Sequence, residues 1–302
     1  MSRRLQFAAL GAIASAAALA AATPAAADPT LWVAKAKGST VYLVGTVHLL
    51  PPDVKWRTPA VEKALKDSSE LWLEIKLPVG PGDAEEMKRT QQLVAATGMA
   101  PADAPPLSSK LTADEWTKLQ AVTAPAHVPP AMLERMQPWF ASVVVAQVIA
   151  QGLGWSADSG VDTTLDRDAL AQGKPVRGLE SPEQQMRMFG AMPAEAQVGL
   201  LRSGLDDAGE VGKAKLASLA RDWAAGDDAA AAKHLVDGIR DKSPELYARM
   251  LVARNRAWIP QIEEMLKTPG VRMIAVGEEH LLGPDGVPAL LKADGMRVEH
   301  VH

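Results

Sequence analysis

Short apolar runs with the character of β-strands occur near both ends of the chain. Residues 31–45, LWVAKAKGSTVYLVG, predict two strands joined at the turn-forming segment Lys-Gly-Ser. Leu71, Leu73 and Ile75 alternate with other residues, so they predict a further strand with one apolar face. The expected strands are the two within residues 31–45, then 70–75, 175–179, 271–276 and 296–301.

Between these runs, apolar residues follow helical spacing from about residue 82 to 170 and again from 182 to 267. Pro-rich segments interrupt the first stretch, and breaks near Gly209, Gly226 and Ser243 interrupt the second. The middle of the chain is therefore expected to form several separate helices.

The longest helix candidate covers residues 131–152, and Pro138 is expected to bend or split it. Its 143–149 run is apolar on every side, which predicts a helix buried in the core. Shorter helices are expected at residues 59–69 and 285–294.

These elements indicate an α/β fold. The strand–helix–strand order of residues 41–75 is typical of a parallel pair of strands joined by a crossover helix. We expect a central, mainly parallel sheet completed by the C-terminal strands, with the helical middle as a large insertion that caps it. Residues 28–302 would form a single domain, and a looser arrangement of two domains is the alternative.

The first 27 residues have the pattern of a secretory signal. Arg3 and Arg4 precede an Ala-rich apolar stretch over about residues 10–22, and small residues then lead to Asp28. A membrane anchor is the alternative interpretation, but the apolar stretch is short and weakly hydrophobic. We expect cleavage after about Ala27, no stable membrane anchor afterwards, and a periplasmic or secreted protein.

Composition narrows the possible partners and chemistry. The chain has no cysteine, so it forms no disulfide and carries no lipid on cysteine, which fits an exported bacterial protein with a sizeable core. Loss of the signal would remove two arginines and no acidic residue, changing the net charge from −4 to −6. No basic block is present, which argues against a nucleic-acid partner. The motifs of common serine hydrolases, NTPases and zincins are absent from the sequence.

A nine-residue motif occurs twice in the chain. GTVHLLPPD at residues 45–53 and GEEHLLGPD at residues 277–285 are identical at six positions. In each copy an apolar strand ends at a glycine, and a histidine follows three residues later. If both strands lie in one sheet, His48 and His280 leave it at the same edge, where ligand sites gather in parallel sheets. The repeat therefore predicts two halves of one site.

Two converging histidines and a carboxylate are typical of an open metal site. The best-placed carboxylate is Glu74 within the strand LWLEI, although an exposed sheet face explains that residue equally well. His48, Glu74 and His280 are the expected ligands of a divalent ion, with Mn, Co and Zn as candidates. In the second motif, we expect Glu278 at the surface, and the role of Glu279 stays open.

Other polar residues have a structural and a functional interpretation. Asp162 is either a site residue or an acid at the start of a helix. Glu180 ends a predicted strand and either joins the site or leads into a helix. Arg254 lies on a predicted helix, where arginine is usually solvated. His300 and His302 have spacing that supports a shared metal only weakly, and a frayed chain end is the simpler interpretation.

The paired Gly-x-x-His motifs resemble those of the TraB/GumN family. The similarity extends to LWLEI, GVD, KPVRGLES and RNRAW, and to the closing segment VGEEHLLGPDGVPALLKADGMRVEHV. It covers essentially the whole chain after the signal. GumN-like members are exported bacterial proteins, and the wider group includes the metal-dependent Tiki proteases, erythromycin esterases and haem-binding ChaN-like proteins.

The resemblance implies an α/β fold with both histidines and a glutamate in one cleft. Carried over residue by residue, it makes His48, Glu74 and His280 metal or catalytic residues. Glu180 and Arg254 become supporting residues of the same site.

These expectations combine into an exported, metal-dependent hydrolase of the peptidase type. The ion would activate a bound water molecule, and Glu180 or Glu279 would accept its proton. Arg254 would stabilise the developing oxyanion or bind a substrate carboxylate. The substrate would be a peptide or another small molecule. The alternative is a periplasmic accessory protein that binds haem, a metal or a polysaccharide without turnover.

Overall fold

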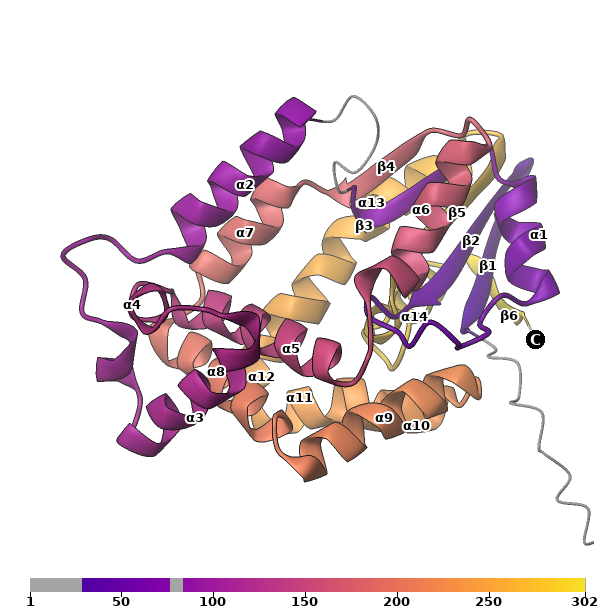
Figure 1. The fold of residues 1–302 in the computed structure, drawn as a ribbon. Helices are drawn as coiled ribbons and strands as arrows, with labels where there is room; N and C mark the ends of the chain where they lie inside the picture. The colour runs from indigo at the N-terminus through magenta and orange to yellow at the C-terminus, as the bar shows by residue number, and fades with distance from the viewer. Residues whose placement is uncertain (1–28, 77–83, 302) are drawn as a thin grey trace, which may run out of the picture.

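A six-stranded sheet forms the centre of the structure, a computed structural model that describes residues 29–76 and 84–301. The strands are β1 (Leu31–Ala36), β2 (Ser39–Thr46), β3 (Glu70–Ile75), β4 (Val176–Glu180), β5 (Gly270–Gly277) and β6 (Arg297–Val301). Their order across the sheet is β4-β3-β5-β2-β1-β6. β4, β3, β5 and β2 are parallel, whereas β1 pairs with β2 and β6 in antiparallel fashion. The expected α/β fold, with a mainly parallel sheet closed by C-terminal strands, is confirmed (Figure 1).

Helices cover both faces of this sheet. On one face, Leu65 and Leu165 pack with Leu71 of β3. On the other, Trp258 and Ile262 pack with apolar residues of the central strands. The sheet is therefore the middle layer of three. The covering helices are α1 (Pro59–Asp67) and α6 (Val161–Ala171) on the first face, and α13 (Ala253–Lys267) and α14 (Val287–Ala293) on the second.

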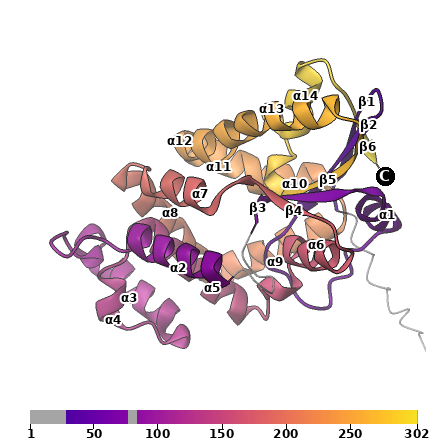
Figure 2. The ribbon, with the colours of Figure 1, turned by 90° about the horizontal axis from the view of Figure 1, so that it is seen from above.

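A group of helices, here named the helical cap, lies to one side of the sheet (Figures 1 and 2). It consists of α2 (Ala84–Gly98), α3 (Ala113–Thr123), α4 (Pro130–Leu133), α5 (Pro138–Gly152), α7 (Pro182–Gly190) and α8 (Ala194–Asp207), with the 3₁₀ turns η1 (Leu107–Lys110) and η2 (Ala124–Ala126). The cap has its own apolar core, in which Leu119, Val145 and Leu201 are fully buried. The helical insertion is thus present, but α6 and α13 belong to the sheet layers.

A further series of helices leads from the cap back to α13. Val236, Tyr247 and Leu251 form a small core of their own with Leu282. These elements are α9 (Glu210–Ala224), α10 (Asp228–Ala232), α11 (Gly238–Lys242) and α12 (Pro244–Tyr247), with the π-helical segments η4 (Lys233–Asp237) and η5 (Ala248–Val252). The remaining 3₁₀ turns are η3 (Ala157–Ser159) and η6 (Glu278–His280). The expected breaks near Gly209, Gly226 and Ser243 separate helices here.

The long helix expected at residues 131–152 differs from the structure in two respects. It is divided into α4 and α5, and Pro138 begins α5, where its missing N–H leaves no hydrogen bond unmade. The 143–149 run is not buried on every side, since Val143 is 43% exposed. One side of α5 packs in the cap, and the opposite side faces open space beside the sheet edge.

The crossover around α1 also differs from the expectation. β2 and β3 are parallel, but β5 lies between them and pairs with both. A strand from the far end of the chain therefore completes the centre of the sheet. The expected signal sequence lies outside the described residues. Among the helices of the described part, none has the length and apolar character that crossing a membrane requires.

Candidate active site

The two copies of the repeated motif lie side by side. β2 and β5 are neighbouring parallel strands, with Thr46 opposite Gly277, so both motifs leave the sheet at the same edge, as predicted. Their histidines then diverge. His48 contacts α6 on one face of the sheet, whereas His280 is buried against α13 on the other.

Each motif glycine makes room for a carboxylate of the second motif. A Cβ atom on Gly45 would overlap Oε2 of Glu278, and one on Gly277 would lie 2.8 Å from Oε1 of Glu279. The space at Gly45 lets Glu278 fold inward and bind the hydroxyl of Thr30, so the expected surface position of Glu278 is wrong. Burial raises the pKa of Glu278 to about 8 and also raises the pKa of Glu279.

Both ring nitrogens of His280 have polar partners. Asn255 donates from Nδ2 to the carbonyl of Asp285 at 2.8 Å, so its Oδ1, 2.6 Å from Nδ1 of His280, accepts the ring proton. Nε2 of His280 then accepts from Nη1 of Arg254 at 3.0 Å. Burial lowers the pKa of His280 to about 3, which keeps the ring neutral at neutral pH.

Arg254 links the carboxylates of two strands. Its Nη2 donates to Glu74 at 2.7 Å, and its Nε and Nη2 donate to the two oxygens of Glu180 at 2.9 and 3.0 Å. The guanidinium also lies over the ring of Trp258, whose Nε1 donates to Glu180. The arginine is only 8% exposed, so the usual solvated position of a helical arginine does not apply. Glu180 and Arg254 form one rigid, charge-paired unit.

Glu74 sits at the centre of this arrangement. It is 7% exposed, which excludes the solvated sheet face as an explanation. Oε1 accepts from the backbone N–H of Gly277 at 2.7 Å and lies 3.6 Å from Nε2 of His280. Burial alone would raise the pKa of Glu74, but His280, His48 and Arg254 together lower it to about 2. Glu74 is therefore an ionised carboxylate at neutral pH.

His48 is held by the start of α6. Its Nδ1 lies 3.2 Å from Oδ1 of Asp162 in the first turn of that helix. The preceding backbone is fixed as well, because the N–H of Val161 donates to the carbonyl of Val47 at 3.1 Å. A Cβ atom on Gly160 would overlap the carbonyl oxygen of His48, so only glycine permits this approach.

The environment of His48 favours its charged form. Partial desolvation in the pocket lowers its pKa, but the hydrogen bond to Asp162 and the charges of Asp162, Glu74 and Glu279 raise it to about 10. His48 is therefore an imidazolium at neutral pH. Its side chain is 56% exposed, so a ligand can reach it from the adjoining cavity.

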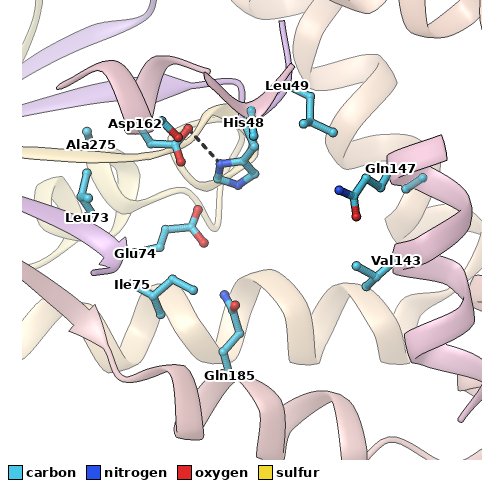
Figure 3. Close-up of a pocket in the computed structure, with 13 residues that line it drawn as sticks. His48, Leu49, Leu73, Glu74, Ile75, Val143, Gln147, Asp162, Gln185 and Ala275 are labelled. Atoms are coloured by element: carbon cyan, nitrogen blue, oxygen red, sulfur yellow. Dashed lines mark ion pairs between the residues drawn. The ribbon is translucent and has the colours of Figure 1, made fainter. Parts of the chain in front are cut away.

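That cavity has a volume of about 420 Å³ and opens between the sheet edge and the cap. Figure 3 shows the carboxylate of Glu74 directed toward the imidazole of His48, with Val143 and Gln147 of α5 on the opposite wall. The cavity therefore combines a carboxylate and a cationic imidazole on one wall with a largely apolar helix on the other. Its size is that of a small-molecule site.

The candidate metal ligands, as they are placed, do not fit a metal ion. Nε2 of His280 faces the cationic Arg254, and both oxygens of Glu74 accept N–H groups. Nδ1 of His48 pairs with Asp162. Within residues 29–76 and 84–301, no three His, Cys, Asp or Glu side chains are grouped so that they could hold a metal.

Two residues of the site were missing or undecided from sequence alone. Asn255 received no role, although Ile259 and Ile262, at i+4 and i+7, place it on the buried stripe of α13. The sequence permits two roles for Asp162, a site residue or an acid at the start of a helix. It occupies the first turn and also binds His48, and no sequence pattern separates those two roles.

Comparison with known proteins identifies the family of this chain. The model of the TraB/PrgY/gumN family matches residues 30–300. The "Uncharacterized protein YbaP" of Escherichia coli (strain K12) and its namesake of Shigella flexneri are each 25% identical over 251 residues, covering 83% of this chain and 87% of theirs. No solved structure matches the chain. Because the family model spans nearly all described residues, the chain belongs to the TraB/PrgY/gumN family.

Proposed function

We propose that this chain is an exported hydrolase of the peptidase type, with a site divided between its two Gly-x-x-His motifs. The observation that carries the proposal is that His48, paired with Asp162, and the ionised Glu74 line one cavity. Hydrolysis of an amide or ester bond requires a base that activates water, a group that stabilises negative charge on the carbonyl oxygen and an acid that protonates the leaving group. Export rests on the signal pattern at the N-terminus.

The roles follow from charge and position. As an imidazolium, His48 stabilises negative charge that develops on the carbonyl oxygen and can donate its proton to the leaving group. Glu74 orients the attacking water. Its low pKa makes it a weak base, so Glu279, whose pKa is raised by burial and by the charge of Glu74, is the proposed proton acceptor.

The contacts of Glu180 and Arg254 support a positioning role for both. Glu180 accepts three N–H groups from Arg254 and Trp258, which leaves it poorly suited to accept a proton from water. Arg254 holds Glu74 and His280 in place. Both residues therefore fix the geometry of the groups that would act on the substrate.

Dependence on a divalent ion is a separate proposal. Binding of an ion by His48, Glu74 and His280 would require Arg254 to give up its hydrogen bonds to Glu74 and His280. Metal analysis of the purified protein, beside His48→Ala and His280→Ala, tests this. One or two ions in the wild type that each variant loses would support a metal site, and equal content in all three would remove it.

The hydrolase proposal is tested by Glu74→Gln, a change that keeps size and removes charge. We expect kcat/KM on a responsive peptide or ester to fall by at least about 100-fold with the fold intact by circular dichroism. Glu70→Gln is the matched control, because Glu70 lies on the same strand but pairs with Arg177 and Arg272 outside the cavity. Wild-type turnover in Glu74→Gln would remove the proposed role. A Soret band without turnover would favour the haem-binding alternative.

A further inference from the structure

The open side of α5 carries the apolar residues Val143 and Ala146 and one polar residue, Gln147. Ala141, Val145 and Ile149 pack into the core of the cap, whereas Val143 and Ala146 are exposed on another side of the helix. An exposed apolar helix face beside a polar site is typical of a surface that binds apolar groups. Figure 3 shows Val143 across the cavity from Glu74 and His48.

A second cavity adjoins the first along this helix. Its volume is about 250 Å³, and it shares His48, Leu49 and Ala146 with the first cavity. Because His48 borders both, a ligand that contacts His48 can extend into either. The other lining residues are Val47, Ile149, Ala150, Trp155, Gly204, Asp207 and Leu216.

We propose that this second cavity is a subsite that binds one uncharged apolar side chain of a peptide substrate, aliphatic or aromatic. The proposal rests on the proposed hydrolase function and specifies its substrate class. The α5 residues that border the two cavities run from Val143 to Ala150, a rise of about 10 Å. That length accommodates about three residues of extended peptide. The bond to be cleaved would lie beside His48 and Glu74.

The lining chemistry selects the kind of side chain. Apolar groups make up most of the cavity wall; among its described lining residues, Asp207 is the one acidic side chain and His48 the one cationic side chain. A cavity of this volume is smaller than a typical whole-ligand site and matches a single side chain. Burial of a leucine or phenylalanine side chain from water tightens binding by about ten- to a hundredfold, which is enough to determine which residue is preferred at this position.

A pair of matched variants on α8 isolates the second cavity. Gly204 lines it, and a Cβ atom there would make only an ordinary contact, 3.5 Å from Val145, so Gly204→Leu extends a side chain into the space. Gly199 lies on the same helix with nothing within 4 Å of its Cβ position and lines neither cavity. Both substitutions favour the helix equally, which makes Gly199→Leu the control.

Binding is read directly at Trp155, a lining residue of the second cavity. Its indole N–H resonance is assigned in the ¹⁵N-tryptophan-labelled full chain by comparison with Trp155→Phe. The probes are acetyl-Ala-Leu-Ala-amide and the same peptide with Phe, Lys or Gly at the centre. We expect the Leu and Phe peptides to shift this resonance saturably in wild type and Gly199→Leu. We expect at least a tenfold weaker affinity in Gly204→Leu and for the Gly peptide.

Preferential binding of the Lys peptide would overturn the proposal, because Asp207 would then select a cation. Equal binding to both leucine variants, or no shift with any peptide, would also overturn it. The measurement needs no turnover. If the Leu and Phe peptides bind as expected but no peptide is cleaved, the hydrolase proposal fails while the apolar subsite stands.

Discussion

At the scale of single residues, Asn255 determines which nitrogen of His280 carries the proton. Its amide is fixed by the carbonyl of Asp285, so its oxygen faces the ring. Asn255→Ala would leave a buried N–H of His280 without its acceptor. We expect the free energy of unfolding in urea to fall by about 1–3 kcal/mol. The ¹⁵N chemical shifts of His280 should also lose the signature of a proton fixed on Nδ1.

Gln261→Ala is the control for this change. Gln261 lies on the same helix and donates to the carbonyl of Leu179 at 3.1 Å, away from His280. We expect a smaller loss of stability there and unchanged His280 shifts. Identical His280 shifts in wild type and Asn255→Ala would show that Asn255 does not set the tautomer.

Gly45, the glycine of the first motif, is required because any side chain there would overlap Glu278. Gly45→Ala would place a methyl group where Glu278 has its carboxylate, and overpacking of this kind costs about 1–3 kcal/mol. Removing the carboxylate should relieve the clash, so Gly45→Ala is expected to cost much less in a Glu278→Ala background. A double-mutant cycle of unfolding free energies measures this coupling. Additive effects of the two changes would contradict the contact.

The burial and the role of a single residue could be predicted from the sequence only where a local pattern constrained them. Glu74 was identified because a polar residue interrupts an apolar strand, and its burial is confirmed. Glu278 is expected at the surface but is buried, and nothing in the sequence reveals that Gly45 makes room for it 233 residues away. Burial of a charged group depends on partners that are distant along the chain.

At the scale of elements, α6 positions the loop that carries His48. The close approach of Gly160 to the His48 carbonyl predicts that Gly160→Ala pushes the loop away from α6. Backbone strain is not involved, since Gly160 has φ −58° and ψ 147°. We expect a stability loss of about 1–3 kcal/mol, and an altered imidazole chemical shift of His48 as its contact with Asp162 weakens.

Gly152→Ala controls for the general effect of replacing glycine. It lies at the end of α5 with nothing within 4 Å of its Cβ position. Stability there should stay the same or rise slightly, since alanine favours helix. If Gly160→Ala were equally harmless, the proposed packing of the His48 loop on α6 would be wrong.

Helices and strands were predicted well where the spacing of apolar residues was clear. Their burial was predicted less well, because it depends on contacts with other parts of the fold. The strands and the helix breaks follow from local patterns, which the structure confirms within a residue or two. The full burial expected for residues 143–149 is wrong, because apolar residues occupy every position of this run except Gln147, both where the helix meets the cap and where it borders a cavity. The spacing of apolar residues predicts the helix itself, but it does not show where a neighbouring element leaves a cavity beside it.

At the scale of the whole molecule, the order of strands depends on distant parts of the chain. The sequence predicted that the C-terminal strands complete the sheet, and β5 and β6 do so. It did not predict that β5 separates β2 from β3. Local patterns show where strands begin and end, but pairing between segments about 200 residues apart is decided by packing of the helices on both faces.

The path of the chain argues that sheet and cap unfold together. It passes from β3 into the cap at α2, returns from α5 to α6, and enters the cap again after β4. Unfolding the cap would therefore release the N-terminal end of α6 and the C-terminal end of β4, two consecutive elements that hold one face and one edge of the sheet. We expect hydrogen exchange in increasing urea to show that α8 and β5 lose protection at the same concentration, as for a single cooperative domain. If α8 instead lost protection at a clearly lower urea concentration than β5, sheet and cap would be two domains. The apolar core of the cap would then unfold independently of the sheet.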